Sequence, residues 1–308
     1  MAGQAPAPLV ECGAPEGGRA FWLRAADGVR LRVGYWPGER LALVLPGRTE
    51  VIEKYGLVVR DLAAAGWGAL VVDWRGQGLA DRALADPLRG HVGDFAEFQR
   101  DLDAVLDFAQ AQAQAPGPMP WLAHSMGGCI ALRGLTRGLP CKAVAFSAPM
   151  LGLAQEPGKL RALGWLAALA RPFRADRGYA PTTGAGFGLP SMAFEGNNLT
   201  TDPAQFERMK AQILGDPRLS LGGPSLRWMA AALAEITALA ALPSPEVPAL
   251  FGLGGAEGIV SPAAVRDRAA RWPGAELAEY PGARHELLME RPEVREDFLA
   301  RVSALFSR

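Results

Sequence analysis

Ser125 stands in a sequence context that could turn its hydroxyl group into a nucleophile. It lies in the string Ala123-His124-Ser125-Met126-Gly127, between an apolar stretch typical of a buried strand and a helical stretch. A serine on a sharp strand-to-helix turn exposes its Oγ atom, and so tight a turn requires small residues two positions before and after it. Ala123 and Gly127 meet this requirement. The alternative interpretation is a serine that only caps the following helix.

Two backbone N–H groups are expected to stabilise the oxyanion that forms when such a serine attacks a carbonyl carbon. Met126, the first helical residue after the serine, has an N–H without a partner inside the helix. The second donor is expected in the loop after the third strand, which reads Pro46-Gly47-Arg48-Thr49-Glu50. Gly47 allows close backbone approach, so the Arg48 N–H would point towards the site. An ordinary strand-to-helix turn is the alternative.

The general base is expected to be His285. Where the nucleophilic serine stands on a strand-to-helix turn, the catalytic residues follow the chain order serine, acid, histidine, and the histidine comes after the last strand. His285 follows the final predicted strand. His124 lies inside the nucleophile motif, where its side chain points away from the position of a base, and His91 precedes the nucleophile. A histidine of an ordinary surface loop is the alternative for His285.

The acid is expected after the penultimate strand, in the turn Gly254-Gly255-Ala256-Glu257-Gly258-Ile259-Val260. Glu257 is the only carboxylate in this turn, and its role would be to hold the imidazole tautomer and to stabilise the imidazolium. A solvated turn glutamate is the alternative. Asp267, inside the next helix, is a weaker rival.

The elements that must position these residues alternate along the chain, which predicts a mostly parallel sheet with helices on both faces, an α/β fold. Strands are predicted at 20–25, 29–36, 41–45, 68–74, 121–123, 143–146, 249–253 and 276–280, and helices at 50–65, 94–113, 262–272 and 292–306. The alternation stops near residue 148. We therefore expect a core formed by 1–147 and 246–308, with 1–18 flexible, and a helical cap insertion at 148–245.

The composition argues against nucleic-acid, metal and cofactor chemistry. Lys and Arg together number 32, as do Asp and Glu, so no long-range positive field favours nucleic acid. His285-Glu286 has Met289 where a zinc motif needs its second histidine. The three cysteines are Cys12, Cys129 and Cys141. Their spacing fits neither a metal site nor a disulfide framework, which indicates free thiols in a reducing compartment. We expect no cofactor and no metal.

The chain lacks the usual features of export and of membrane insertion. Residues 1–18 are rich in Ala, Pro and Gly and show no basic region followed by an apolar one, so they do not form a signal peptide. No apolar run approaches the roughly 20 residues that span a bilayer. We expect a cytoplasmic protein whose contact with the inner membrane face is at most peripheral.

The sequence resembles the bacterial lysophospholipase L2 and monoacylglycerol lipase group of α/β-hydrolases, which are serine aminopeptidase S33-type hydrolases. The resemblance rests on three strings, Leu45–Glu50 with Lys54-Tyr55, Asp73–Leu79 and Ala123–Gly128, and on Gly282 with His285-Glu286. It implies the α/β-hydrolase fold, a triad of Ser125, Glu257 and His285, and an oxyanion hole of the Arg48 and Met126 N–H groups. Most relatives have Asp at the position of Glu257, and many have His at that of Pro46.

The cap insertion is where substrate specificity would be determined. Segments 159–173 and 226–239 carry apolar residues at helical spacing, and Lys159, Arg161, Arg171 and Arg174 surround the first. One interpretation is an acyl-chain groove with a basic rim that meets anionic lipid. The alternative is that these apolar faces only pack the cap onto the core.

We therefore expect a serine carboxylic-ester hydrolase that works through an acyl-enzyme, as a lysophospholipase or monoacylglycerol lipase. A generic short-chain esterase, or an amidase or peptidase on the same triad, is the nearest rival. The third alternative is a catalytically inactive binding module, because a fold does not fix a function.

Overall fold

The structure, a computed structural model, describes residues 5–112 and 117–308. In this part of the chain, nine strands form one sheet in the order β1-β2-β3-β5-β4-β6-β7-β8-β9. Neighbours from β5 to β9 are parallel, whereas β1, β2 and β3 form an antiparallel edge. The strands are β1 (Pro6–Ala7), β2 (Arg19–Arg24), β3 (Arg30–Trp36), β4 (Arg40–Leu45), β5 (Trp67–Asp73), β6 (Trp121–His124), β7 (Val144–Ser147), β8 (Ala249–Gly254) and β9 (Glu276–Tyr280).

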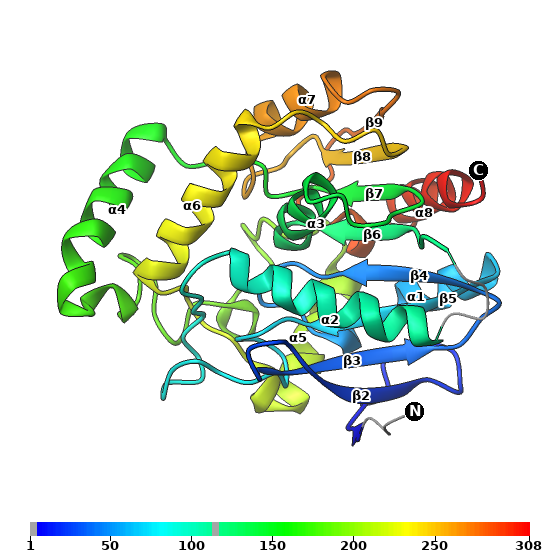
Figure 1. The fold of residues 1–308 in the computed structure, drawn as a ribbon, viewed down its shortest axis with the longest axis horizontal. Helices are drawn as coiled ribbons and strands as arrows, with labels where there is room; N and C mark the ends of the chain where they lie inside the picture. Colours follow the sequence, from blue (N-terminus) through cyan, green and yellow to red (C-terminus); the bar gives the residue numbers. More distant parts are fainter. Residues whose placement is uncertain (1–4, 113–116) are drawn as a thin grey trace.

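Helices cover both faces of this sheet (Figure 1). Helices α2 (Ala96–Gln112), α3 (Met126–Thr136) and α7 (Pro262–Ala270) pack on one face, and α1 (Gly56–Ala64) and α8 (Pro292–Phe306) pack on the other. Strands covered on both sides are apolar throughout rather than alternating, and every residue of β5 is buried. The predicted alternation of strands and helices is confirmed.

The segment between β7 and β8 carries three further helices, α4 (Pro157–Ala170), α5 (Pro203–Gly215) and α6 (Leu226–Ala241). Helices α4 and α6 lie side by side at the left in Figure 1, at the end towards which the parallel strands run. Helix α5 instead packs against the 3-10 turn that precedes α1, η1 (Ile52–Tyr55), where Gln212 Nε2 donates to Glu53 O (2.9 Å). The division at residues 148 and 245 stays a prediction.

Two details differ from the sequence-based expectation. The helix expected from residue 50 begins as the 3-10 turn η1 (Ile52–Tyr55) and continues as α1. Strand β1, which was not predicted, pairs with β2, and Cys12 is buried, although the flexibility of 1–18 stays a prediction. Residues 1–4 and the expected helix end at Ala113 lie outside the described residues.

Candidate active site

Ser125 is the residue at which β6 turns into α3. Its backbone has φ 50° and ψ −116°, a conformation that costs about 1–3 kcal/mol for a residue with a side chain. Ser125 N donates to Ser147 O (3.0 Å), and Ser125 O accepts from Gly128 N (2.9 Å). A Cβ on Gly127 would lie 2.0 Å from Leu45 O, so a side chain at this position would collide with the neighbouring strand. This is the tight turn that the small-residue spacing predicts.

The loop after β4 lies against this turn. A Cβ on Gly47 would lie 3.1 Å from Ser125 Cβ. Gln77 Nε2 donates to Gly47 O (2.8 Å), and because the C=O and N–H of one trans peptide point in opposite directions, this bond sets the direction of the Arg48 N–H. Among the described residues, neither Arg48 N–H nor Met126 N–H has an acceptor within the protein. Two such donors beside a serine are what an oxyanion requires.

The string that follows β5 supports the same loop. Trp74 Nε1 donates to Pro46 O (2.9 Å), and Thr49 N donates to Gln77 Oε1 (3.3 Å). Asp73 Oδ1 accepts from Ile52 N (3.0 Å), at the start of η1. The Asp73–Leu79 string therefore holds the candidate oxyanion loop in place.

Glu257 and His285 meet at the ends of β8 and β9. His285 Nδ1 lies 2.7 Å from Glu257 Oε2, and the other carboxylate oxygen accepts from Ile259 N (2.7 Å) and Val260 N (3.1 Å). Burial by itself would raise the pKa of Glu257, but the hydrogen bond from His285 and the two amides outweigh it, so the pKa is lowered. Glu257 is therefore an ionised acceptor that fixes the Nδ1–H tautomer of His285.

The rival residues occupy other environments. His124 Nδ1 lies 3.0 Å from Ser147 O, and burial lowers the pKa of His124 to about 3, which keeps its ring neutral. His91 Nδ1 contacts Ser225 Oγ (2.8 Å), just before α6. Asp267 is exposed and pairs with Arg271. Of the three histidines, all of which lie in the described residues, only His285 hydrogen-bonds the Glu257 carboxylate.

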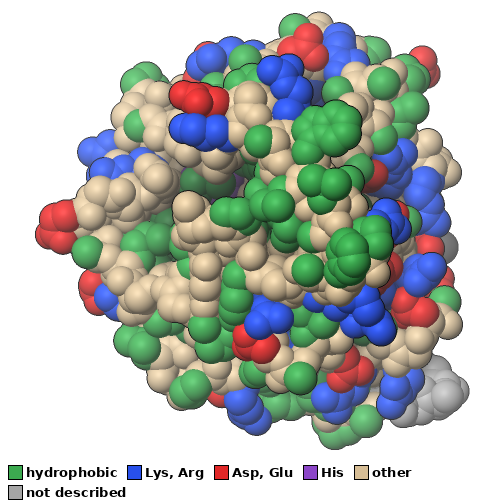
Figure 2. All heavy atoms as spheres, turned by 90° about the vertical axis from the view of Figure 1, so that its left-hand side faces the viewer, with side chains coloured by type: hydrophobic (Ala, Val, Ile, Leu, Met, Phe, Trp, Pro, Cys, Tyr) green, Lys and Arg blue, Asp and Glu red, His purple; other side chains and the backbone are tan. Residues whose placement is uncertain are grey.

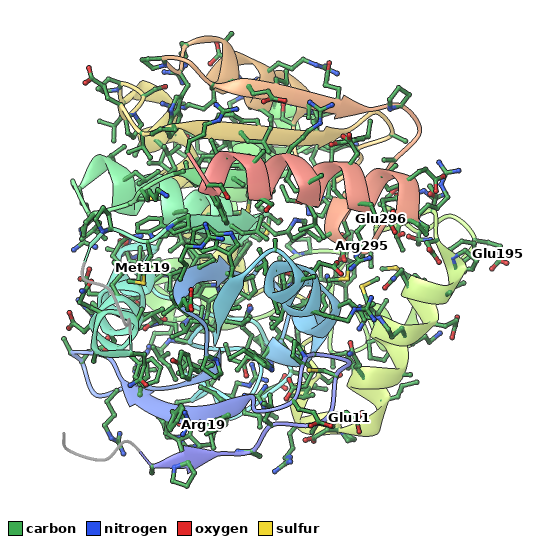
Figure 3. The ribbon with its side chains drawn as sticks, turned by 90° about the vertical axis from the view of Figure 1, so that its right-hand side faces the viewer. Glu11, Arg19, Met119, Glu195, Arg295 and Glu296 are labelled. Carbon is green, nitrogen blue, oxygen red and sulfur yellow. The ribbon has the colours of Figure 1, made fainter. Side chains whose placement is uncertain are left out.

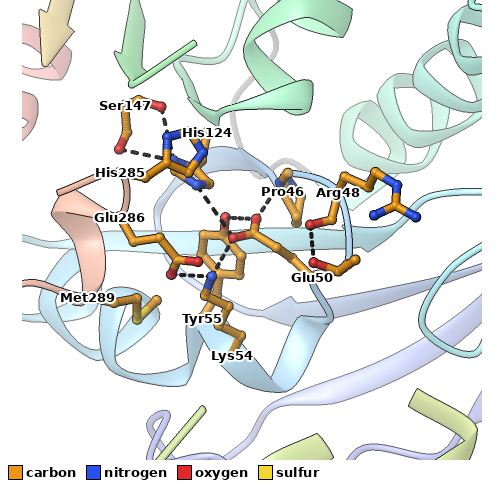
Figure 4. Close-up of polar contacts among 12 residues, drawn as sticks. Pro46, Arg48, Glu50, Lys54, Tyr55, His124, Ser147, His285, Glu286 and Met289 are labelled. Carbon is orange, nitrogen blue, oxygen red and sulfur yellow. Dashed lines mark hydrogen bonds and ion pairs between the residues drawn. The ribbon is translucent and has the colours of Figure 1, made fainter. Parts of the chain in front are cut away.

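A buried polar cluster next to these residues was not predicted (Figure 4). It brings together Glu50, Lys54, Tyr55, His124 and Glu286. The ring centroids of His124 and His285 lie 4.8 Å apart, so the cluster borders the candidate base. The sequence held one clue, the four-residue spacing of Glu50 and Lys54, which is the spacing of a helical ion pair. Nothing in the sequence places Glu286 beside them.

Three members of this cluster have the donor types of a metal site. One ligand atom each from Glu50, His124 and Glu286 lie within 4.8 Å of one another. The Lys54 ammonium, however, contacts both carboxylates. A divalent cation there would face a buried positive charge at contact distance, which is strongly unfavourable. The residues present therefore form an ion-pair network with its own cation.

The segment between β7 and β8 touches the candidate oxyanion loop and presents an apolar outer face. Arg48 Nη2 donates to Gly222 O (2.6 Å), and its guanidinium lies 5.2 Å from the ring centroid of Trp228 on α6. Figure 2 shows hydrophobic side chains beside Lys and Arg on the face that α4 occupies. The exposed large apolar residues of α4 and of the 3-10 turn that follows it are Trp165 (74%), Leu166, Leu169 and Phe173 (83%).

Comparisons with known proteins agree with this architecture. Residues 38–292 match the serine aminopeptidase S33 family. Lysophospholipase L2 of Escherichia coli is 35% identical over 289 residues, which cover 88% of this chain and 81% of that protein. A probable lysophospholipase L2 of Haemophilus influenzae is 27% identical over 266 residues, with 86% and 82% covered.

Solved structures of similar fold include monoacylglycerol lipases. A soluble variant of the Saccharomyces cerevisiae monoglyceride lipase has a TM-score of 0.72 at 21% identity and covers 92% of this chain and 93% of that one. The Paleococcus ferrophilus monoacylglycerol lipase has a TM-score of 0.69 at 21% identity, with 91% and 98% covered. The α/β-hydrolase fold is thus confirmed. In the described residues, no helix is both long and apolar enough to cross a membrane. The chain belongs to the serine aminopeptidase S33 family of α/β-hydrolases, in the group that contains lysophospholipase L2.

Proposed function

We propose that the chain hydrolyses carboxylic esters of lysophospholipids or monoacylglycerols through an acyl-enzyme on Ser125. The names of its relatives, lysophospholipase and monoglyceride lipase, describe cleavage of such esters. The observation that carries the proposal is the 2.7 Å contact between His285 Nδ1 and Glu257, at the same sheet edge as the strained Ser125 turn. A serine hydroxyl becomes a strong nucleophile only beside such an oriented base.

In the proposed mechanism, His285 Nε2 takes the Ser125 Oγ proton while Oγ attacks the ester carbonyl carbon. The Arg48 and Met126 N–H groups hold the oxyanion, and Glu257 stabilises the imidazolium. The C–O bond of the ester then breaks, His285 protonates the departing alcohol, and the acyl group stays on Ser125. Water, deprotonated by His285, releases the fatty acid in the second half of the cycle.

Arg48 supports a substrate with an anionic headgroup. No carboxylate among the described residues pairs with its guanidinium, and its Nε atom is buried without an acceptor. Burial lowers the pKa of Arg48 to about 10, because no counter-charge offsets the loss of hydration. A phosphodiester would supply that counter-charge through charge-assisted hydrogen bonds, which favours lysophospholipid over monoacylglycerol.

Helix α4 supports transient contact with a lipid surface. Trp165 of α4 is 74% exposed, and Phe173, in the 3-10 turn η2 (Arg171–Phe173) that follows α4, is 83% exposed. Lys159 and Arg161 lie on α4 with Trp165. Exposed aromatic and aliphatic side chains with basic neighbours are typical of a helix that lies in the interface of an anionic membrane. The proposed location is therefore the cytoplasm, with reversible binding at the inner membrane face.

The name of the matching family, serine aminopeptidase S33, suggests peptides as a second class of substrate. An aminopeptidase needs a free carboxylate near the nucleophile for the substrate ammonium group. The carboxylates beside this site do not meet that need, because Glu50 and Glu286 contact Lys54, and Glu257 contacts His285. The ester proposal is therefore preferred.

The experiment compares wild type with Ser125→Ala on lysophosphatidylcholine, monoacylglycerol, short p-nitrophenyl esters and aminoacyl amides. Ser125-dependent release of long-chain fatty acid supports the proposal and identifies the headgroup. Turnover of short esters alone would leave a generic esterase, and turnover of amides alone would make the chain a peptidase. A folded protein that binds lipid but reacts with neither the substrates nor a fluorophosphonate probe would be a binding module.

A further inference from the structure

We infer that Lys54 is a positioning residue, a buried clamp that ties the loop of the oxyanion donor to the loop of the catalytic histidine. The inference rests on the proposed function, because it assigns work to Arg48 and His285. The Lys54 side chain is 9% exposed, and its Nζ atom contacts Glu50 Oε1 and Glu286 Oε2 (Figure 4). These two carboxylates belong to segments that are far apart in the chain.

The first arm of the clamp reaches the oxyanion loop. Glu50 Oε2 accepts from Gly47 N, and it also accepts from Tyr55 Oη (2.6 Å). Gly47 directly precedes Arg48, so the Glu50 carboxylate holds one side of Gly47 while Gln77 holds its carbonyl group. Burial by itself would raise the pKa of Glu50, but several opposing contributions, led by the charge of Lys54, together lower it. This carboxylate is therefore charged and strongly bound to the ammonium.

The second arm reaches the catalytic histidine. Glu286 follows His285 directly, and both backbone N–H groups are held by the insertion: His285 N donates to Asn198 O (3.3 Å), and Glu286 N donates to Leu199 O (2.8 Å). The Glu286 side chain is buried and turns to Lys54. One ammonium group thus bridges the segments that precede α1 and follow β9. Displacement of either loop by about 1 Å is enough to lower a catalytic rate up to about 100-fold.

A buried ion-pair network is on average weak evidence for stability, because desolvation of the charges offsets their attraction. A purely structural network would change the free energy of unfolding and leave the rate of each folded molecule unchanged. A clamp on two catalytic loops would instead lower kcat, because it positions groups that act in the transition state, while KM stays within about twofold. The two roles therefore differ in a measurable way.

The experiment uses the full chain and four variants. Glu286→Leu removes the second arm and keeps the Lys54–Glu50 pair, Lys54→Met removes both arms, and Glu286→Gln keeps an oxygen acceptor for Lys54. Arg295→Met is the matched control, since Arg295, labelled in Figure 3, is a buried cation of α8 that pairs with Asp61 of α1. Hydrolysis of a p-nitrophenyl ester is measured per folded protein, together with the rate of fluorophosphonate labelling and urea unfolding.

We expect Glu286→Leu and Lys54→Met to lower kcat and the labelling rate roughly 10- to 100-fold with KM nearly unchanged. Glu286→Gln should keep most of the activity, and Arg295→Met should lose stability only. If Lys54→Met does not fold, the kcat of Glu286→Leu alone tests the positioning role. The clamp is refuted if Glu286→Leu keeps the wild-type kcat within about twofold. A wild type that hydrolyses no ester would instead refute the proposed function.

Discussion

The substitution Glu257→Gln tests the pairing of acid and base with almost no change in shape. In the wild type, Glu257 Oε1 accepts from Ile259 N and Val260 N, and Oε2 lies 2.7 Å from His285 Nδ1. A glutamine would keep its carbonyl oxygen on the two backbone amides, which are donors only, so its NH2 group would face His285. This NH2 group would donate to Nδ1 and move the imidazole proton to Nε2. Nε2 is the atom that must accept the Ser125 proton.

The expected loss is large because it combines a wrong tautomer with an unstabilised imidazolium. In well-studied serine hydrolases the corresponding change lowers kcat by about 10⁴. We expect a fall of roughly 10³- to 10⁴-fold, which corresponds to about 4–5.5 kcal/mol of transition-state stabilisation. The assay is steady-state hydrolysis of a p-nitrophenyl ester, with the concentration of folded protein taken from circular dichroism. KM should change little, because Glu257 does not touch the substrate in this mechanism.

Asp267 provides the control, since it is the rival acid of the sequence analysis and pairs with Arg271 on the surface. Asp267→Asn should keep the wild-type rate. If Glu257→Gln kept more than about a tenth of the wild-type kcat, the tautomer argument would fail. Loss of activity in Asp267→Asn at the same time would move the acid to Asp267.

Four further outcomes are expected. Gln77→Leu should lower kcat roughly tenfold without a change in KM, because the Arg48 N–H loses its orientation; an unchanged kcat would mean that Gln77 does not orient it. Arg48→Met keeps the backbone N–H but should lower kcat/KM for lysophosphatidylcholine more than for monoacylglycerol, and an equal fall for both would leave the guanidinium only a role in holding the insertion. Trp165→Ser with Phe173→Ser should weaken sedimentation with anionic vesicles while short-ester hydrolysis stays at the wild-type rate; undiminished sedimentation would place the lipid contact elsewhere. The pKa of Glu257 in the folded protein is lowered from its ordinary value of 4.5. The ionised carboxylate therefore stabilises the fold above pH 4.5, and this contribution is lost as the pH falls from there through the lowered pKa of the folded state. The difference in Tm between wild type and Glu257→Gln should therefore shrink below pH 4.5, and a constant difference would contradict the lowered pKa.

The sequence predicted the positions of the candidate triad because these depend on local chemistry and chain order. The turn at Ser125 needs small neighbours, and those neighbours are adjacent in the sequence. Glu257 and His285 each follow a strand, and parallel strands bring their carboxyl ends to one edge of the sheet. Their 2.7 Å contact needs only that two neighbouring strands, β8 and β9, lie in register. The same reasoning could not predict β1, a two-residue strand whose only support is its pairing with β2.

The contacts that tune the site were decided by the tertiary structure. Whether Lys54 is a solvated helix residue or a buried bridge depends on where the loop after β9 places Glu286, and no local pattern encodes that distance. The role of Gln77 likewise depends on the approach of its turn to Gly47. Arg48 meets Gly222 only because the segment between β7 and β8 lies against the loop after β4. Hydrophobic periodicity and turn chemistry are properties of short segments, so the sequence by itself determined the elements, their order and the chemical groups at their ends. Burial, pairing and pKa arise between segments that are distant in the chain, and they exist only once the sheet and its insertion have packed.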